Sequence, residues 1–451
     1  MDLSFGTDGV RGRIGAGLDA ASVRGLGFAA AGQLGSGSVV VGHDPRESGP
    51  DLVAALAEGF VAGGVDVISL GMVPTPAVAC VAALDSVAGA MVSASHNPWW
   101  DNGVKLFAAG GRKLGDEAQE AIQEVWHRRP RLDPTGGYLG ADVADRRWAD
   151  SVVGSVAPGA LSGMRLVVDC ANGATSLSAG RVLSRLGAQV TVIHDSPDGR
   201  NINERCGSTS PESLQDAVVS SGADAGLAFD GDGDRVVAVA SDGSLLDGDH
   251  LLAICAVDRL GRGLLTGSTV VVTVMANLGL RRGLADHEIL VHETDVGDRN
   301  VLEALDNGGW SLGGEQSGHI VFPELATTGD GLLTGVQVLD AVARAGRTIG
   351  EMAAELVSRT PQVLESIPVS GSGAAVVDGV ADLIHAEAGR LGSDGRVLVR
   401  PSGTEPVVRV MVEAVDAGTA ETVAERLCEA VRNADGGAGT GARGGQSTGW
   451  S

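Results

Sequence analysis

The sequence is poor in lysine and has no long apolar run. Lys105 and Lys113 are its only lysines, so arginine supplies nearly all of the 33 basic residues. Lysine can exchange a proton near neutral pH and arginine cannot, so a lysine kept in a polar loop favours proton transfer there. No stretch approaches the ~20 apolar residues of a membrane-spanning helix. The first residues also lack the basic and apolar regions of a signal peptide, so we expect neither membrane insertion nor secretion.

Cysteine is also scarce, and the charge is strongly of one sign. The five cysteines are scattered and form no Cys-x-x-Cys pair, which predicts reduced thiols in the cytoplasm rather than disulfides or zinc ligands. Acidic residues outnumber basic ones by 57 to 33, and the net charge is −24. This charge opposes binding to nucleic acids and to anionic membranes. A site for a phosphorylated metabolite must therefore supply its own positive charge.

What the sequence does contain is a repeated α/β pattern, in a chain of 451 residues that exceeds what one core usually supports. β-branched runs alternate with amphipathic stretches rich in Ala and Leu, which is typical of α/β units around a parallel sheet. We expect three such modules. Their first strands are expected at 39–41, 165–169 and 269–273, and their last strands at 90–92, 225–229 and 310–312.

After residue 361 the pattern changes to a small α+β domain, with a helix expected at 376–388. The predicted fold class is α/β: three similar α/β domains with mainly parallel mixed sheets plus a C-terminal α+β domain, arranged around a central cleft. The expected boundaries are 1–150, 151–252, 253–360 and 361–435. A tail at 436–451, rich in Gly, Ala, Ser and Thr, is expected to be disordered.

A polar loop follows the last strand of each module: Ser93–Pro98, Asp230–Arg235 and Gly313–His319. Ligands of open α/β sheets bind beyond the carboxyl ends of the strands. Three special loops at equivalent positions therefore predict three domains that face one cleft.

The first of these loops presents a serine. Pro98 lacks a donor N–H and biases Asn97 away from helix, so the backbone must turn after the preceding apolar run. Ser95 is thereby placed at the end of a strand, with His96 beside it and Lys105 close behind. This grouping suits a residue that accepts and returns a group during catalysis. The alternative is an ordinary polar loop.

The second loop has three carboxylates at alternate positions, with glycines between them. Oxygen-only donors select a hard cation, and Mg²⁺ is the usual one in cells. An EF-hand also begins Asp-x-Asp-x-Asp, but it needs glycine at position six and glutamate at position twelve. Arg235 and Ser241 stand there, which excludes an EF-hand. An acidic turn without a cation would suffer strong repulsion.

Two further regions suit a phosphorylated sugar. Arg400–Pro406, with Arg409 nearby, offers guanidinium groups and hydroxyls that can bind a phosphate dianion; a surface turn is the alternative. Gly313–Gly318 supplies a carboxylate, an amide and a hydroxyl that can bind sugar hydroxyls. Arg11, on a glycine-flanked turn, is either a phosphate contact or an interdomain salt bridge. Together the loops predict a phosphotransfer site.

These loops, with Phe5–Gly12, Asn201–Asn203, Val296–Arg299 and Thr328–Gly331 in the same order, resemble the α-D-phosphohexomutase superfamily along nearly the whole chain. The loop Gly313–His319 is most similar to that of the bacterial-type phosphoglucosamine mutases. The resemblance implies interconversion of glucosamine 6-phosphate and glucosamine 1-phosphate, for UDP-N-acetylglucosamine synthesis. It further implies a phosphoserine enzyme and glucosamine 1,6-bisphosphate as the intermediate.

The resemblance also implies roles for particular residues. Ser95 matches the phosphoserine, and Mg²⁺ would be held by its phosphate together with Asp230, Asp232 and Asp234. The resemblance places His96, Lys105, Arg11 and Arg235 in the catalytic set. It places Glu315, Ser317 and His319 at the sugar, and Arg400, Ser402, Gly403, Thr404 and Arg409 at the non-reacting phosphate. Trp99 and Trp100 form an unusually bulky pair beside the serine.

Three alternatives remain open at this point. The nearest is another branch of the superfamily, a phosphomannomutase or phosphoglucomutase. A metal-dependent sugar phosphatase would also use an Asp-x-Asp loop. A sugar-phosphate sensor without catalysis is the third, although the presence of Ser95, Lys105 and the metal-loop aspartates argues against it.

Overall fold

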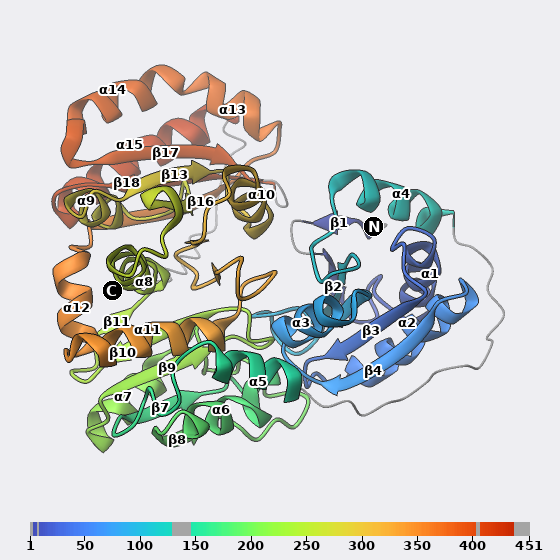
Figure 1. Ribbon diagram of the computed structural model, residues 1–451. Coiled ribbons are helices and arrows are strands. Elements are labelled where there is room, and N and C mark those ends of the chain that lie inside the picture. The colour runs from blue at the N-terminus through green and yellow to red at the C-terminus, as the bar shows by residue number, and fades with distance from the viewer. Residues whose placement is uncertain (1–2, 7–8, 129–145, 403–405, 437–451) are drawn as a thin grey trace. The chain divides into compact units, whose positions relative to one another are not determined.

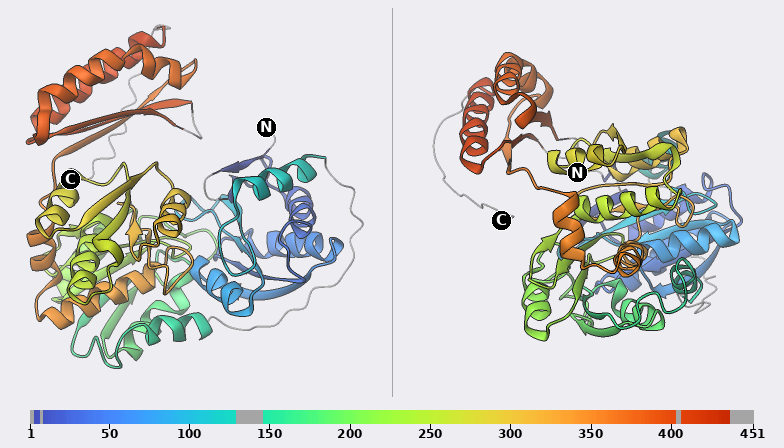
Figure 2. Two further views of the ribbon diagram at one scale, coloured as in Figure 1. Left: turned by 45° about the horizontal axis from the view of Figure 1, so that its top comes forward. Right: turned by 60° about the vertical axis from the view of Figure 1, so that its left-hand side comes forward.

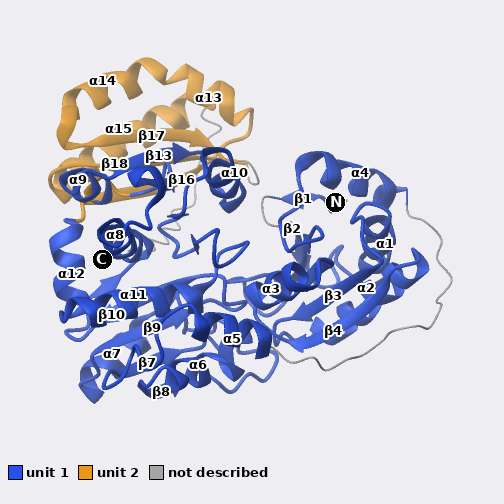
Figure 3. Ribbon diagram, in the orientation of Figure 1, with its two compact units in different colours: residues 1–276, 280–358 blue, residues 277–279, 359–451 orange. Residues whose placement is uncertain are grey.

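The computed structural model describes residues 3–6, 9–128, 146–402 and 406–436 (Figure 1). The tail predicted to be disordered, 436–451, lies almost wholly outside the described residues. The chain divides into two compact units, one of residues 1–276 and 280–358 and the other of residues 277–279 and 359–451 (Figure 3). Apart from residues 277–279 and 359–360 of the third, the three predicted α/β modules lie in the first unit, and the α+β part lies in the second.

The first module has a six-stranded mixed sheet in the order β1-β2-β6-β5-β3-β4. Strands β4, β3 and β5 are parallel, and β6, β2 and β1 extend the sheet antiparallel. The strands are β1 (Phe5–Gly6), β2 (Gly9–Arg13), β3 (Ser38–His43), β4 (Asp66–Met72), β5 (Ala88–Val92) and β6 (Asp101–Phe107), and the helices are α1 (Ala20–Ala31), α2 (Gly49–Ala62), α3 (Thr75–Asp85) and α4 (Asp116–His127).

The second module repeats this topology in the order β11-β10-β9-β7-β8, with β8, β7 and β9 parallel and β10 and β11 antiparallel. Its strands are β7 (Arg165–Asp169), β8 (Gln189–Ile193), β9 (Ala225–Phe229), β10 (Val236–Ala240) and β11 (Leu245–Leu246), and its helical elements are α5 (Arg146–Gly154), η1 (Ala174–Leu177), α6 (Ala179–Arg185) and α7 (Glu212–Ser221).

The third module has the order β13-β12-β14-β15, again with three parallel strands and an antiparallel return. Its elements are α8 (Gly248–Gly261), β12 (Thr269–Thr273), α9 (Leu278–Asp286), β13 (Leu290–Thr294), α10 (Asp298–Gly308), β14 (Gly313–Gly314), β15 (Ile320–Val321), α11 (Gly331–Ala345) and α12 (Ile349–Leu356). The strand expected at 310–312 is wrong in position. Trp310 instead packs against His292 with the two rings tilted and their centroids 4.6 Å apart, and the strand forms at Gly313–Gly314.

The modules of the first unit share a core. Along β3, Val39 and Val41 pack with residues of α1 and α2, whereas Val40 packs with residues of α3 on the other face, as the two-residue period of a strand requires. The cluster containing Val40 continues through Leu166 in the second module and Val270 in the third. One apolar cluster therefore joins the three modules of the first unit, whose ribbons are shown from two further sides in Figure 2.

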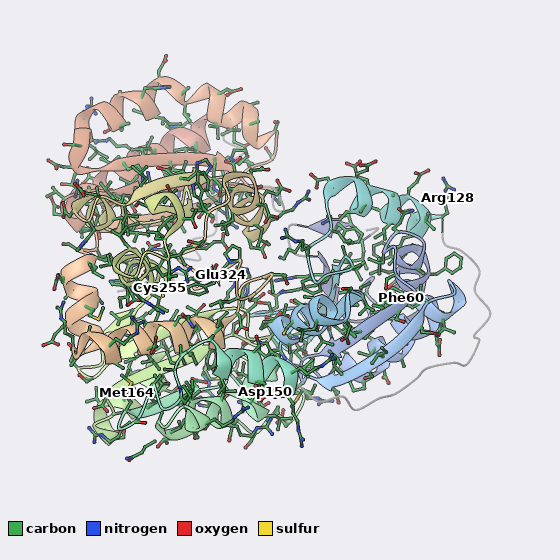
Figure 4. The ribbon with its side chains drawn as sticks, in the orientation of Figure 1. Phe60, Arg128, Asp150, Met164, Cys255 and Glu324 are labelled. Atoms are coloured by element: carbon green, nitrogen blue, oxygen red, sulfur yellow. The ribbon has the colours of Figure 1, made fainter. Side chains whose placement is uncertain are left out.

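Side chains fill the interior of every module. Figure 4 labels Phe60 of α2 in the first module and Cys255 of α8 in the third, and both are buried. All five cysteines are free thiols, as predicted. Within the described residues, no helix combines the length and the apolar character needed to cross a membrane.

The second unit has a three-stranded antiparallel sheet in the order β16-β18-β17, from β16 (Gln362–Pro368), β17 (Arg396–Pro401) and β18 (Val407–Glu413). Its helices are α13 (Gly373–Gly379), α14 (Ala381–Leu391) and α15 (Ala417–Ala434). The single helix expected at 376–388 is wrong, since two helices meet at Val380. Mixed sheets in three α/β modules and a separate α+β unit confirm the predicted fold class.

Candidate active site

The three predicted loops occupy one position in the shared topology. Each connects the last parallel strand (β5, β9 or β14) to the antiparallel strand that follows it (β6, β10 or β15). The middle loop, Asp230–Arg235, receives backbone N–H groups from all three modules. Thr75 donates to the carbonyl of Asp232 at 2.8 Å, Ala174 to that of Gly231 at 2.8 Å, and Gly331 to that of Gly233 at 3.0 Å. The site is thus assembled around this loop.

Ser95 is buried and points at the middle loop. Its backbone has φ 52°, a left-handed conformation that costs energy for a residue with a Cβ. Its Oγ donates a hydrogen bond of 2.6 Å to Asp230 Oδ2, and its backbone N–H donates to Ser93 Oγ at 2.8 Å. His96 Nδ1 lies 3.5 Å from the same Oγ. The structure brings together the serine, the histidine and the first aspartate, as the sequence predicts.

The three aspartates of the middle loop are buried, and their oxygens lie within 4.8 Å of one another. Lys105 Nζ lies 2.9 Å from Asp232 Oδ2 and 2.8 Å from Asp234 Oδ2. Asp232 Oδ1 and Asp234 Oδ1 are buried and have no hydrogen-bond partner in the described part of the chain. Buried carboxylate oxygens without a partner are costly, and they are what a hard cation would coordinate.

The electrostatics of this cluster also favour a bound cation. Burial, with repulsion from Asp234 and Asp232, raises the pKa of Asp230 well above its usual value. Burial also acts to raise the pKa of Asp234, but attraction to Lys105 and His319 outweighs it and leaves that pKa well below the usual value. The lysine contacts only Asp232 and Asp234, so negative charge remains in excess in this cluster. A divalent cation fits this donor set and this charge.

His96 is held neutral at pH 7. Burial lowers its pKa to about 4, and the positive charges of Arg235 and Arg11 add to that effect. A neutral imidazole beside Ser95 Oγ can accept a proton. Arg235 is the last residue of the middle loop, and its Nε lies 3.8 Å from Asp234 Oδ1. Arg11 lies on β2, where it pairs with Gly103 of β6. Both arginines thus belong to the surroundings of His96.

In the third loop, His319 lies next to the middle loop. His319 Nε2 accepts a hydrogen bond of 3.1 Å from the backbone N–H of Gly329, so its proton is on Nδ1, which lies 3.8 Å from Asp234 Oδ1. Glu315 Oε1 accepts from the backbone N–H of Gly297 at 3.3 Å. Ser317 Oγ is buried and has no hydrogen-bond partner among the described residues. A ligand hydroxyl would satisfy it.

Sequence reasoning missed the ion pair behind His319. Asp298 at the start of α10 pairs with Lys113, and its Oδ2 lies 3.7 Å from His319 Nε2. The signal was present, since Lys113 is the only lysine besides Lys105. Both lysines of the chain therefore lie close to the three loops.

Trp99 and Trp100 lie on the flank of the serine loop. The Arg200 guanidinium lies 5.1 Å from the centre of the Trp99 ring, and Arg200 also forms a bidentate ion pair with Glu47. Trp99 therefore helps to join the serine loop to the second module.

The predicted phosphate-binding residues lie in the second unit. Arg400 on β17 is directly opposite Arg409 on β18, so both side chains project from the same face of that sheet. The backbone N–H of Ser402 donates to the carbonyl of Val407 at 2.9 Å. Gly403 and Thr404 lie outside the described residues. Two guanidinium groups on one face are suited to a phosphate dianion.

Models of the phosphoglucomutase/phosphomannomutase α/β/α domains I, II and III match residues 2–131, 147–243 and 247–360, and the C-terminal domain model matches 368–430. The phosphoglucosamine mutases of Thermobifida fusca and Rhodococcus jostii are 48% and 47% identical to this chain, each over 96% of it and 99% of their own length.

Solved structures agree. A phosphoglucomutase/phosphomannomutase family protein from Burkholderia thailandensis superposes with a TM-score of 0.81 at 29% identity, covering 97% of this chain and 99% of its own. The Aspergillus fumigatus N-acetylphosphoglucosamine mutase, solved with GlcNAc-6P and magnesium, has a TM-score of 0.72 at 19% identity and covers 96% of each chain. At that identity the second likeness shows the fold alone.

Three α/β modules that bring a serine loop to an aspartate loop, followed by a small α+β unit, define an isomerase of the phosphohexomutase type. The chain belongs to the phosphoglucomutase/phosphomannomutase family. The superfamily predicted from the motifs is thereby confirmed. The relatives at 46–48% identity carry the name of the branch that the loop Gly313–His319 predicted.

Proposed function

We propose that this chain interconverts glucosamine 6-phosphate and glucosamine 1-phosphate. The sequence identity of 46–48% to phosphoglucosamine mutases over 96% of the chain supports this substrate. The same identity disfavours the phosphomannomutase and phosphoglucomutase alternatives. A buried serine hydroxyl 2.6 Å from the first of three clustered aspartates is the observation that carries the reaction type. A protein that only senses the sugar phosphate would not need a nucleophilic hydroxyl at that position.

Ser95 is the proposed carrier of the phosphoryl group. O1 and O6 lie at opposite ends of the sugar, so one group cannot pass directly between them. Phosphorylated Ser95 transfers its phosphoryl group to O1 of glucosamine 6-phosphate: the P–Oγ bond breaks, the P–O1 bond forms, the O1 proton leaves to a base, and Oγ takes up a proton. After the resulting 1,6-bisphosphate turns around, Ser95 Oγ loses its proton to a base and takes the phosphoryl group from O6, and O6 receives a proton.

The chain's own residues supply the proton transfer and most of the positioning. His96, neutral and 3.5 Å from Ser95 Oγ, is the proposed base; such groups contribute roughly 10²–10⁴-fold. Lys105 contacts two carboxylates and would offset phosphate charge or exchange a proton there. Asp230, Asp232, Asp234 and the phosphate on Ser95 would hold one Mg²⁺, which supplies charge neutralisation for phosphoryl transfer.

The remaining assignments concern the rest of the substrate. Glu315, Ser317 and His319 are proposed to bind the sugar hydroxyls. The non-reacting phosphate is assigned to Arg400, Ser402, Gly403, Thr404 and Arg409, with Arg11 and Arg235 as further phosphate contacts. We propose that the four domains end at residues 150, 252, 360 and 435. The five free thiols support a cytoplasmic location.

A side-by-side assay tests this proposal. Purified protein with Mg²⁺ and a catalytic amount of hexose 1,6-bisphosphate is given glucosamine, mannose and glucose 6-phosphates, and the 1-phosphates are quantified. We expect the highest kcat/KM with glucosamine, phosphate on the Ser95 peptide by mass spectrometry, and no turnover by Ser95→Ala. Faster mannose turnover would overturn the substrate, and an active Ser95→Ala would overturn the carrier. Release of inorganic phosphate without isomerisation would indicate a phosphatase.

A further inference from the structure

Arg46, which follows β3, is a fully buried guanidinium beneath the serine loop. Its Nε donates to Asp44 Oδ2 at 2.9 Å. Its Nη2 donates to the carbonyls of Ser95 and Asn97, each at 2.8 Å, and its Nη1 donates to the carbonyls of Asp101, at 3.0 Å, and Pro98. A guanidinium has five N–H groups, so all five are used, four of them on the backbone of one loop.

A second side chain reaches the same carbonyls from the second module. Asn203 Nδ2 donates to the carbonyl of Ser95 at 3.0 Å and to that of Asn97 at 3.2 Å. The space there is filled, because a Cβ on Gly231 would lie 2.6 Å from the Ser95 carbonyl oxygen and 2.8 Å from Asn203 Nδ2. The carbonyl of Ser95 is therefore held by two donors from two modules.

This arrangement bears on the conformation of Ser95. A serine at φ 52° relaxes to ordinary backbone unless its surroundings hold it. Turning that peptide would swing Oγ away from Asp230 and leave Arg46 donors buried without acceptors, which is costly. Asp44 completes the support, since its Oδ2 also accepts from Ser93 Oγ at 2.6 Å, and Ser93 Oγ accepts the N–H of Ser95.

We propose that Arg46 and Asn203 are positioning residues for phosphoryl transfer: by binding the carbonyls of Ser95 and Asn97 they hold the Ser95 hydroxyl toward the metal loop. Neither side chain is assigned to contact the sugar or its phosphates. Their loss should therefore lower the rate of transfer to and from Ser95 and leave substrate affinity nearly unchanged. This inference rests on the proposed carrier role of Ser95.

The test for Arg46 is Arg46→Lys, because a lysine retains the charge but lacks the planar fork that reaches four carbonyls. The control is Arg259→Lys, which alters another buried arginine, one that bonds the carbonyl of Leu264 and Glu324. Single-turnover transfer from a hexose 1,6-bisphosphate to Ser95 is followed by intact mass, together with kcat, KM and Tm. Both variants should lose Tm, and only Arg46→Lys should slow transfer, by at least ~30-fold.

The test for Asn203 is milder and keeps the inference falsifiable if Arg46→Lys does not fold. Asn203 and Arg205 both have positive φ, 58° and 52°, so glycine suits either backbone. Asn203→Gly should slow transfer about 5–20-fold at unchanged KM, whereas Arg205→Gly should match the wild type. Wild-type transfer rates in folded Asn203→Gly, or in folded Arg46→Lys, would overturn the positioning role. Activity in Ser95→Ala would instead overturn the carrier role on which it rests.

Discussion

The Ser95 hydroxyl donates a hydrogen bond of 2.6 Å to Asp230 Oδ2, although the two residues belong to different modules. The contact places the group proposed to carry phosphate directly against the group proposed to hold metal. A phosphate on Ser95 would enter the space between the serine and the three aspartates, where the uncompensated charge is negative. A divalent cation is what allows a phosphate dianion to be tolerated there.

Asp232→Asn should weaken Mg²⁺ binding and turnover together. Its Oδ2 contacts Lys105 and Thr75, while its buried Oδ1 has no partner among the described residues. We expect the variant to need at least ~10-fold more Mg²⁺ for half-maximal activity, with a kcat loss of ~10²-fold or more. Calorimetric titration with Mg²⁺ measures the expected loss of Mg²⁺ affinity. The exposed Asp242, two residues beyond β10, supplies the control Asp242→Asn, and an equal Mg²⁺ requirement in both variants would contradict the metal assignment.

Lys105→Met should be destabilising without Mg²⁺ and inactive with it. Removing a buried lysine between two carboxylates leaves uncompensated charge, at a cost of about 3–5 kcal/mol. A divalent cation can replace part of that charge, so Mg²⁺ should raise the Tm of this variant more than that of the wild type. Thermal unfolding with and without Mg²⁺ measures the difference. An identical Mg²⁺ response in the two proteins would show that the lysine and the metal do not share a site.

Gly231→Ala should abolish activity through sterics alone. The new methyl group would approach the Ser95 carbonyl oxygen to 2.6 Å, and a backbone atom cannot move aside as the end of a flexible side chain can. Gly261→Ala at the end of α8 is the control, because nothing lies within 4 Å of its Cβ. That substitution should be neutral or stabilise by up to about 1 kcal/mol. Comparable activity in the two variants would mean that the loops are not packed as described.

Asp330 should make the protein less stable as the pH rises from about 4 to 7. Burial raises its pKa to about 6, although the N–H groups of Leu333 and Trp148 oppose that rise. The folded state then holds a proton that the unfolded chain releases near the ordinary aspartate pKa of 3.8. The stabilisation by the Asp330 proton is complete below the pKa of the unfolded state. It is lost as the pH rises through the pKa of the folded state, which lowers the free energy of unfolding by roughly 3 kcal/mol.

Urea unfolding in EDTA, with wild type and Asp330→Asn compared between pH 4 and 7, measures this effect. The variant cannot titrate at this position. The wild-type free energy of unfolding minus that of the variant should therefore fall with rising pH. A difference that stays constant over this range would contradict the raised pKa.

The sequence was sufficient for the first two loops because each follows an apolar strand, and the carboxyl ends of strands are where ligands bind. The third loop was recognised by its polar residues between glycines, although the strand expected before it was misplaced. The sequence predicted that Ser95, the aspartates and His319 would be brought together. Arg46 and Asn203 were missed. Both side chains donate hydrogen bonds to backbone carbonyls. Every residue has a backbone carbonyl, so the sequence does not show which carbonyls are bound. Asp44–Arg46, a polar run directly after β3, was the available signal, but only the loops after the last strand of each module were used for the prediction.

Errors in the elements have similar causes. The strand at 310–312 was expected from the apolar side chains of Trp310 and Leu312, yet the ladder forms at Gly313 and Gly314. A Cβ on Gly313 would lie 3.0 Å from Val271 and Val301 side chains, so close packing selects residues that a hydrophobicity pattern ignores. The break at Val380 was missed because apolar residues continue on both sides of it, although Asp378-Gly379 directly before it is a turn signal.

The amides of Thr75, Ala174 and Gly331 bond to successive parts of one six-residue loop. A fragment limited to the second module would therefore lack two of the three amide donors that shape its aspartates. Catalytic competence in this chain cannot emerge module by module during synthesis. It should appear only once residues past 331 have left the ribosome and packed. The middle loop can take its final shape only when all three modules are in place.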